Sequence, residues 1–294
     1  MATYNGEKYI YEQLQSIINQ DYENWKLFIG DDNSTDDTEL IINSVACKED
    51  RIEIVDFKAK GGGQLNNFRM LLQYVKNMNF HYIMFSDQDD IWYVNKVSDS
   101  LQLFEKDDKF PTMVYTNYTE NSPDGSIHTK YTSVFPKNAS LKQFLVQNWA
   151  MGCTMMINAA LALLVSKIPD EAENHDNWIM LVALTYGRIR YLPKVTMFHR
   201  IHENNVTTSN SKKRLVFRLR RLFSDFYNRK AYRKNELILM DKLLSINFEV
   251  RQEATVTFYR ILQKKHKIYR VILLWENKIY GLNLHKTIRL WLLI

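Results

Sequence analysis

The sequence predicts an α/β fold, with a mainly parallel sheet flanked by helices and a helical, basic region at the C-terminal end. Two observations support this prediction. In roughly the first two hundred residues, short apolar runs bounded by turn residues alternate with segments whose apolar residues recur at helical spacing. Beyond residue 210 the strand-like runs stop, and Lys and Arg become frequent. We therefore expect an α/β domain over residues 1–210 and an amphipathic, basic helical region over residues 211–294.

The strands and helices of the predicted domain follow one another along the chain. Runs with strand character are Trp25–Gly30, Arg51–Phe57, His81–Phe85 and Thr112–Tyr118. Helical spacing of apolar residues is found in Tyr9–Ile18, Asp36–Ala46 and Phe68–Val75. The expected N-cap of the second of these helices is Ser34 or Thr35. In sheets of this kind, ligands bind beyond the carboxyl ends of the strands.

The composition fits a globular protein of a reducing compartment. Hydrophobic residues make up 46% and charged residues 24% of the 294-residue chain. Cys47 and Cys153 lie far apart, so neither a disulfide framework nor a thiolate zinc site is expected. No signal peptide is recognisable at Met1, and no apolar run reaches the roughly 18 residues that a membrane-spanning helix needs. We therefore expect a cytoplasmic protein.

Charge is distributed unevenly between the two regions. Residues 212–294 contain 20 Lys and Arg against 6 Asp and Glu, whereas the rest of the chain contains 19 against 27. Apolar residues at helical spacing lie beside arginines between Leu215 and Phe226, and aromatic residues are mixed with basic ones between Tyr269 and Trp291. This pattern predicts peripheral binding to the inner face of the cell membrane. Packing of these helices on the α/β domain is the alternative. Nucleic-acid binding is not expected, because no recognised nucleic-acid-binding signature accompanies the basic residues.

Acidic side chains directly follow two of the predicted strands. Asp31 and Asp32 come after the first strand, and the run Asp87–Asp90 comes after the third. Carboxylates gathered at one sheet edge repel one another unless a cation or hydrogen-bond donors lie among them. A ligand site at this edge is therefore one interpretation, and solvated acidic loops are the other.

Five short motifs stand in order along the α/β domain. The first three are Ala2–Gly6 (ATYNG), Gly30–Asp36 (GDDNSTD) and Phe85–Trp92 (FSDQDDIW). The last two are His175–Trp178 (HDNW) and His199–Asn205 (HRIHENN). Together they resemble glycosyltransferase family 2, whose catalytic domain has the Rossmann-like GT-A fold, and in particular its bacterial rhamnosyltransferase-like branch. The resemblance covers roughly residues 1–210 and implies transfer of a sugar from a nucleotide diphosphate.

The resemblance implies a divalent metal, Mn²⁺ or Mg²⁺, at the Asp87-x-Asp89 motif. Such an ion stabilises the charge that builds on the departing diphosphate, and carboxylate oxygens suit it as ligands. Asp89 would be the direct ligand and His202 a further one, with a structural role for His202 as the alternative. Asp87 and Gln88 would face the donor, and Arg200 would contact its diphosphate through the guanidinium fork.

By the same resemblance, the nucleobase lies between the first motif and the end of the strand predicted at Trp25–Gly30. Asp32, with Asp31 as second choice, would accept a hydrogen bond from the ring NH of uracil or thymine. Adenine presents an acceptor nitrogen there, so a pyrimidine is favoured. The remaining residues expected around the base are Thr3, Tyr4, Asn5 and Glu7.

The segment Lys60–Asn67 is unusually rich in glycine. Three consecutive glycines permit a backbone to approach a ligand closely. Gly62 and Asn67 are therefore candidates for contact with the donor. A plain turn from strand to helix is the alternative, and a P-loop is excluded because no GK[ST] follows.

Asp176 stands where the family places its general base, which removes the proton of the acceptor hydroxyl as that oxygen attacks the sugar. The reaction implied is a single in-line displacement with inversion. An N-cap role for Asp176 at the start of the next helix is the alternative. Trp149, Gly152 and Trp178 match family segments near the acceptor, and Trp149 is expected to stack on a sugar face or to belong to the core.

The sequence departs from the family at its start, since only Met1 and Ala2 precede the first motif. The first strand therefore looks truncated, which puts stability in doubt. Our interpretation is an inverting transferase using dTDP-L-rhamnose, or another UDP- or dTDP-sugar. Its expected acceptor is a saccharide or lipid-linked saccharide of bacterial surface polysaccharide synthesis. A non-catalytic, membrane-associated nucleotide-sugar-binding protein of the same fold is the alternative. A nucleotidyltransferase fits less well, because the first motif lacks its glycine-rich basic signature.

Overall fold

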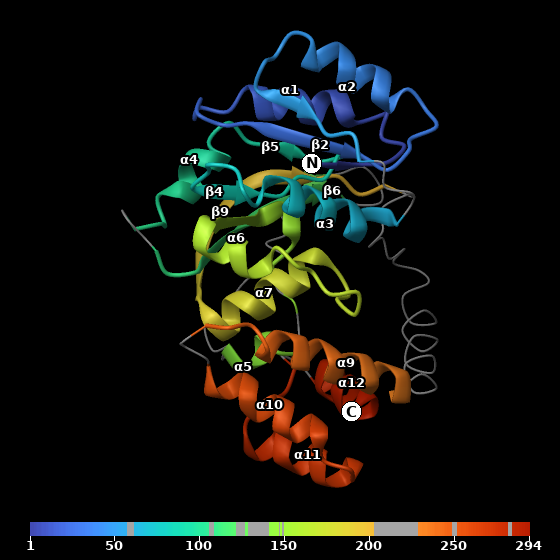
Figure 1. The fold of residues 1–294 in the computed structure, drawn as a ribbon, viewed down its shortest axis with the longest axis vertical. Coiled ribbons are helices and arrows are strands. Elements are labelled where there is room, and N and C mark those ends of the chain that lie inside the picture. Colours follow the sequence, from blue (N-terminus) through green and yellow to red (C-terminus); the bar gives the residue numbers. More distant parts are fainter. Residues whose placement is uncertain are drawn as a thin grey trace.

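The computed structural model describes residues 1–57, 62–105, 109–121, 127–128, 141–146, 148, 150–202, 229–248, 252–281 and 284–294. The molecule is elongated, with its N-terminal sheet and helices at one end and its C-terminal helices at the other (Figure 1). Both α/β character and the predicted strands and helices of the first half are confirmed, as the following elements show.

The N-terminal sheet is parallel and has the order β1-β2-β3. Its strands are β1 (Ala2–Thr3), β2 (Leu27–Asp31) and β3 (Ile52–Ile54). Helices α1 (Ile10–Ile18) and α2 (Thr38–Ala46) pack on it and bury their apolar stripes in a core with Ile29. The predicted cap of α2 is wrong: Asp37 is the N-cap, because Ser34 and Thr35 bond to the first motif instead.

The second sheet is mixed and has the order β4-β8-β6-β9-β5, with β7 beside β6. Only β6 (Thr112–Asn121) and β9 (Arg188–His199) run parallel within it. The other strands pair antiparallel and are β4 (Tyr82–Met84), β5 (Ile91–Trp92), β7 (Ile127–His128) and β8 (Met155–Asn158). The parallel arrangement predicted for the whole domain thus belongs to its first half and to the β6–β9 pair.

The two sheets meet at β1. The Ala2 N–H donates to the carbonyl of Ser86 at 3.3 Å, and the Gly30 N–H donates to that of Met1 at 3.0 Å. The chain leaving β4 therefore runs beside β1, which itself pairs with β2. As a result, Thr3, Asp31 and Asp87 lie at one edge, where β1, β2 and the chain leaving β4 end.

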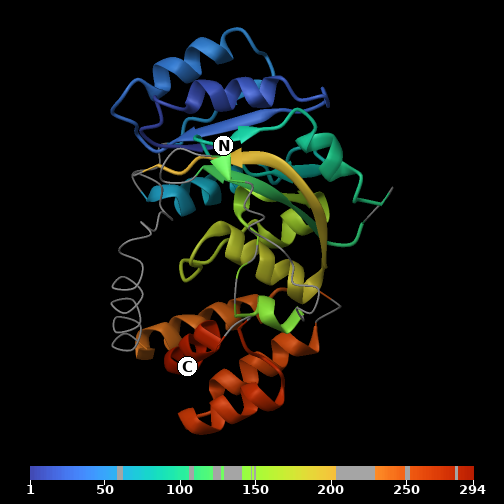
Figure 2. The ribbon, with the colours of Figure 1, turned by 180° about the vertical axis from the view of Figure 1, so that it is seen from behind.

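Helices cover the second sheet and connect it to the C-terminal region. Around it lie α3 (Gly63–Val75), α4 (Lys96–Leu101), α5 (Leu141–Phe144), the short 3₁₀ helix η1 (Gly152–Thr154), α6 (Ala159–Val165) and α7 (His175–Tyr186). Ten residues of α7 are buried, because the sheet lies on one side of it and the C-terminal helices on the other (Figures 1 and 2).

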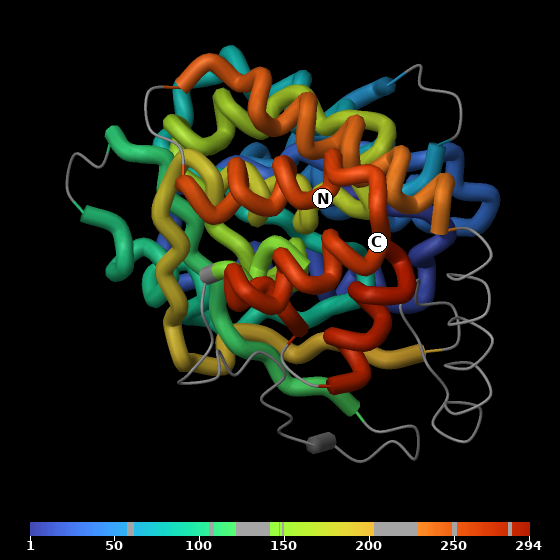
Figure 3. Tube along the Cα trace, turned by 90° about the horizontal axis from the view of Figure 1, so that it is seen from below, coloured from blue at the N-terminus to red at the C-terminus, as the bar shows by residue number. Residues whose placement is uncertain are grey.

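The C-terminal helices are α9 (Arg229–Leu244), α10 (Glu253–Gln263), α11 (Lys267–Glu276) and α12 (Leu284–Leu293). They dock on α7: the Tyr186 hydroxyl donates to the Leu243 carbonyl at 2.7 Å, and Thr185 and Thr255 share a hydrogen bond of 3.2 Å. Seen from below, these helices lie in front of the rest of the chain (Figure 3).

The amphipathic helix expected between Leu215 and Phe226 lies outside the described residues, as does the predicted boundary near residue 210. Within the part of the chain that the structure describes, no helix is both long and apolar enough to cross a bilayer.

Candidate active site

The first motif is held against the second by a set of hydrogen bonds. The Asn5 N–H donates to Ser34 Oγ at 2.8 Å, and Asn5 Oδ1 accepts from the Thr35 N–H at 2.8 Å. Glu7 Oε2 accepts from the N–H of Asp37, the N-cap of α2, at 3.0 Å. The loop after β1 and the loop after β2 therefore form one connected unit at the sheet edge.

Two carboxylates end β2 and differ in their surroundings. Asp31 accepts from the Thr3 hydroxyl at 2.6 Å and from both the N–H and hydroxyl of Ser34 at 2.7 Å. Asp31 is thus engaged within its own loop. Asp32 Oδ2 accepts from the N–H of Gly63 at 2.9 Å, which ties the β2 loop to the start of α3.

The glycine-rich turn begins α3 where this bond is made. Gly63 has a φ of 68°, in the left-handed region that glycine adopts without steric cost. Gly62 is its N-cap. Farther along, Asn67 is buried and donates to the Gly30 carbonyl at 2.7 Å. Asn67 therefore ties α3 to β2, while Gly62 lies at the N-terminus of α3.

The third motif meets the first through a reciprocal pair of hydrogen bonds. The Tyr4 N–H donates to Gln88 Oε1, and Gln88 Nε2 donates to the Tyr4 carbonyl, both at 2.8 Å. The Gln88 side-chain amide thus pairs with the backbone of Tyr4 as the backbone of a neighbouring strand would. The ring of Tyr4 is 55% exposed, so a flat aromatic surface faces solvent beside the loop of acidic residues.

Three carboxylates follow one another closely after β4. Burial together with the negative charges of Asp90 and Asp89 raises the pKa of Asp87 to about 7, although the Gln64 amide donates to it at 2.7 Å. Burial and the charge of Asp90 also raise the pKa of Asp89. The site therefore concentrates more negative charge than its hydrogen-bond donors offset, which is the environment that a cation stabilises.

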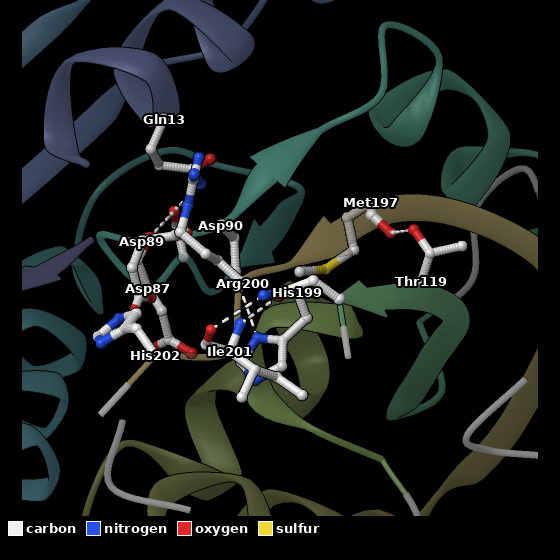
Figure 4. A network of polar contacts seen from close by, with 12 residues as sticks. Gln13, Asp87, Asp89, Asp90, Thr119, Met197, His199, Arg200, Ile201 and His202 are labelled. Carbon is white, nitrogen blue, oxygen red and sulfur yellow. Dashed lines mark hydrogen bonds and ion pairs between the residues drawn. The ribbon is translucent and has the colours of Figure 1, made fainter. Parts of the chain in front are cut away.

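His202 lies opposite Asp89, as Figure 4 shows. Its Nε2 is 2.8 Å from Asp89 Oδ2, and its ring stacks on that of Tyr9 with centroids 4.7 Å apart. Both side chains are largely buried. An imidazole nitrogen and a carboxylate oxygen at one point, with Asp87 close in sequence, fit the ligand preferences of Mn²⁺ and, less closely, Mg²⁺.

Behind this pair lies a second, buried pair, formed by Asp90 and His199. Asp90 Oδ1 is 2.7 Å from His199 Nδ1, and Asp90 has no exposed surface. The hydrogen bond and charge of Asp90 raise the pKa of His199 to about 9 against the opposing effect of burial. Cys153 lies close by, and the three side chains of Asp90, Cys153 and His199 offer potential metal-ligand atoms within 4.8 Å of one another. The charge of Asp90 further acts on Lys96, whose burial lowers its pKa to about 8.

Arg200, between the two histidines, is held by protein groups in this structure. Its Nε donates to the Asp89 carbonyl at 3.2 Å, its Nη2 forms an ion pair with Glu12, and its guanidinium lies over the ring of Tyr9. The guanidinium thus joins the acidic loop to α1. The contact with a diphosphate stays a prediction.

Asp176 lies in the first turn of α7, next to η1. Its Oδ2 accepts from the N–H of Gly152 at 3.2 Å, and its Oδ1 accepts from the N–H of Asn177 at 2.6 Å. The N-cap of α7 is Asn174, so the capping alternative for Asp176 is wrong. Burial raises the pKa of Asp176 to about 6, which is suitable for a carboxylate that accepts a proton near neutral pH.

The three residues expected near the acceptor have different positions. Gly152 contacts Asp176 as described and packs so closely on His175 that a Cβ would overlap its ring. Trp178 is 2% exposed and belongs to the core, so the expectation that it faces an acceptor is corrected: helical geometry turns it inward from α7. Trp149 lies outside the described residues.

Residues to which the sequence analysis assigned no role also belong to the site. Neutral His175, whose pKa burial lowers to about 3, packs between Phe68 and Phe85 and thereby joins α7 to the end of β4. Lys96 and Tyr9 carry no local sequence signal for their roles. Their importance follows only from strand and helix pairing, which a single sequence does not display.

Comparisons with known proteins show the family of the chain. The family described as Glycosyl transferase family 2 matches residues 1–163. A Shigella flexneri protein named dTDP-rhamnosyl transferase RfbG is 30% identical over 94% of this chain and 99% of its own length. An Escherichia coli protein named UDP-Glc:alpha-D-GlcNAc-diphosphoundecaprenol beta-1,3-glucosyltransferase WfgD is 30% identical over 53% of this chain and 57% of its own length.

Solved structures show the same fold at low identity. S. aureus TarS in complex with UDP-GlcNAc superposes with a TM-score of 0.60 and 16% identity, over 94% of this chain and 78% of that one. A mannosyltransferase from Pyrobaculum calidifontis, in complex with GDP-Man and Mn²⁺, gives a TM-score of 0.55 and 13% identity over 94% and 71%. The GT-A prediction is thereby confirmed, and the chain belongs to glycosyl transferase family 2.

Proposed function

We propose that this protein is an inverting, metal-dependent glycosyltransferase that uses a pyrimidine nucleotide diphosphate sugar. The observation that carries the proposal is the contact between Asp89 and His202, which stand 113 positions apart in sequence yet lie 2.8 Å apart. Folding brings an oxygen and a nitrogen ligand together at the edge where the carboxyl ends of β1, β2 and β4 meet.

Asp89 and His202 would hold the divalent ion, with Asp87 beside them on the donor side. When bound, the ion supplies Lewis-acid stabilisation of the diphosphate as it leaves the sugar. The raised pKa values of Asp87 and Asp89 support this assignment, because a cation offsets the repulsion that contributes to them. Mn²⁺ is our first choice since one of the ligands is an imidazole.

The nucleobase would lie between the first motif and the loop after β2. Asp32 is the better candidate to accept from the ring NH, because Asp31 already accepts three hydrogen bonds, one from Thr3 of β1 and two from Ser34. The exposed ring of Tyr4 offers a surface on which a base stacks. Asn5, Glu7 and Gln88 keep these two groups in place through the backbone contacts described above.

Asp176 would act as the general base of a single displacement. The acceptor oxygen forms a bond to the anomeric carbon, its proton moves to the Asp176 carboxylate, and the nucleotide diphosphate leaves with the electron pair of the broken bond. Two backbone N–H groups, of Gly152 and Asn177, fix the orientation of this carboxylate. Attack from the face opposite the leaving group inverts the anomeric centre.

The donor we propose first is dTDP-L-rhamnose, with UDP-glucose as the alternative, and the acceptor is a lipid-linked saccharide of bacterial surface polysaccharide synthesis. Support comes from the names of the relatives, one a dTDP-rhamnosyl transferase and another a glucosyltransferase acting on a diphosphoundecaprenol-linked sugar. A membrane-linked acceptor also agrees with a peripheral position of the enzyme at the membrane.

Calorimetric titration of the full chain with dTDP-rhamnose, UDP-glucose and UDP-N-acetylglucosamine, each with Mn²⁺ and with EDTA, tests the proposal. We expect one donor to bind with Mn²⁺ and to bind at least about tenfold more weakly with EDTA.

Asp89→Asn should lose the metal effect. Asp99→Asn, which removes a carboxylate paired with Lys194 away from the site, should keep it. Metal-independent binding in the wild type would overturn the metal assignment. Binding without turnover on any acceptor would favour the non-catalytic alternative.

A further inference from the structure

Helices α11 and α12 lie in the part of the molecule farthest from α1 and α2 (Figure 1), and they expose a group of large apolar side chains. We call it the outer C-terminal face, and its members are Ile268, Tyr269, Ile272, Trp275, Leu284 and Ile288. Their exposed fractions range from 40% to 78%. Single exposed apolar residues are ordinary on protein surfaces, whereas six gathered on two adjacent helices are not.

This face results from helices that are apolar on two sides. On α11 the inner side buries Arg270 and Leu274, while Ile268, Ile272 and Trp275 recur at i, i+4 and i+7 on the outer side. Packing inside the protein therefore accounts for one apolar side of α11. The outer side has no such explanation within the part of the chain that the structure describes.

The outer side of α12 continues the surface. Leu284, Ile288 and Trp291 follow the same i, i+4, i+7 spacing, and Trp291 meets Trp275 edge to face with ring centroids 6.2 Å apart. A groove of about 660 Å³ opens between the two helices, lined in part by Tyr280 and Lys278. Trp291 is itself partly buried against the core, so the exposed ring at this junction of the two helices is that of Trp275.

Basic residues surround this surface. The described residues of 229–294 contain 13 Lys and Arg against 4 Asp and Glu. Lys264 and Lys265 are exposed directly before α11, Lys278 directly after it, and Lys286 on α12. Apolar side chains, Trp and Tyr rings, and flanking cations are the combination found where proteins lie in the headgroup region of a bilayer.

We propose that the outer C-terminal face binds an anionic lipid bilayer, with its apolar side chains inserted at the headgroup boundary. A second copy of the chain would be a poorer partner, because a two-fold contact between like surfaces brings these lysines toward their own equivalents. Anionic headgroups neutralise the same lysines. This proposal adds a location to the membrane association of the proposed enzyme but does not depend on its donor or metal.

Co-sedimentation of the full chain with vesicles tests the proposal, using phosphatidylcholine alone and phosphatidylcholine mixed with phosphatidylglycerol. We expect binding to the anionic vesicles that weakens with added salt. The triple variant Ile268→Ser/Ile272→Ser/Trp275→Ser should lower the partition coefficient at least about tenfold. The double variant Leu40→Ser/Leu163→Ser is the matched control, since these leucines are 69% and 62% exposed on α2 and α6. It should bind like the wild type.

Three outcomes would overturn the assignment. They are absence of wild-type binding to anionic vesicles, unchanged binding of the triple variant, and a concentration-dependent dimer in light scattering that the triple variant abolishes. Because the substituted side chains are exposed, both variants should keep the thermal midpoint of the wild type. Calorimetric donor binding measured on the same samples separates failure of this proposal from failure of the proposed function, since the triple variant should bind donor normally.

Discussion

At the scale of single residues, the motifs predicted which side chains gather but not how each is held. Asp87 and Asp89 could be named from sequence because they follow a predicted strand, and Asp176 and His202 because they lie in motifs that resemble those of the family. The partners of Asp90 could not be predicted, since the motif that contains His199 does not show what this side chain contacts, and Lys96 lies in no motif. Their roles depend on the pairing of β5 with β9 and on the position of α4, which involve residues far apart in the chain.

Asp176 should control the pH dependence of the reaction. Its pKa is raised to about 6 by burial, and a general base must be unprotonated. We therefore expect kcat/KM to rise with pH through about 6 and to level off above it. Asp176→Asn should lower kcat by roughly 10²–10⁴-fold while leaving donor binding intact. Rate measurements between pH 4.5 and 8 provide the check. A rate that does not change across that range would show that another group takes the proton.

The buried pair of Asp90 and His199 should act as positioning residues. Asp90 adjoins Asp89 in sequence, and His199 precedes His202 by three residues. The 2.7 Å contact between Asp90 and His199 therefore joins the two segments that carry the proposed metal ligands. We expect Asp90→Asn to weaken Mn²⁺ binding by about 10–100-fold and kcat to recover at saturating Mn²⁺.

The matched control for this variant is Asp99→Asn. Asp99 is also a buried carboxylate, and it pairs with Lys194 of β9 at 2.6 Å. It should lower thermal stability without changing the Mn²⁺ dependence. Equal Mn²⁺ dependence in both variants would mean that the Asp90–His199 contact serves stability alone.

At the scale of elements, periodicity and turn chemistry predicted the helices well but their termini less well. The expected cap of α2 at Ser34 or Thr35 moved to Asp37, because both hydroxyl residues serve the first motif. The inward rotation of Trp178 on α7 was also missed. Since α7 is covered on both sides, its apolar residues form no single stripe from which an outer face is predictable.

The close contact between η1 and α7 gives a prediction for Gly152. A Cβ there would overlap the His175 ring, and the Gly152 N–H holds the proposed base. Gly152→Ala should cost about 1–3 kcal/mol of stability and lower kcat by roughly a hundredfold. Gly187→Ala is the control, because Gly187 lies at the other end of α7, where a Cβ would meet the Pro111 carbonyl. It should reduce the melting temperature but spare the kcat of the folded enzyme. Similar kcat losses in both variants would refute the positional argument.

At the scale of the whole molecule, the sequence predicted two regions with different composition, and the structure shows a shared core between them. Met240, Leu243, Phe258 and Leu262 are almost completely buried in the same cluster as α7. The composition change was visible in sequence, whereas the packing of these helices on α7 was not, because it joins segments far apart in the chain.

This shared core predicts that residues 1–228 do not fold alone. Each large apolar side chain of the C-terminal helices contributes about 1.5–3 kcal/mol by burial, so losing several removes more than a typical net stability of about 5–15 kcal/mol. We expect the truncated chain to aggregate or to melt without a cooperative transition in calorimetry. A truncated chain with the wild-type melting temperature and donor affinity would establish residues 1–228 as an independent domain.

The hydrogen bonds between the first, second and third motifs have a thermodynamic consequence. Three contacts join the loops of these motifs: Tyr4 with Gln88, Asn5 with Ser34, and Glu7 with Asp37. Ordering a loop on binding costs conformational entropy, and loops that are already joined to one another avoid that cost. The affinity for the proposed nucleotide would therefore come from new contacts, with little deduction for the ordering of these loops.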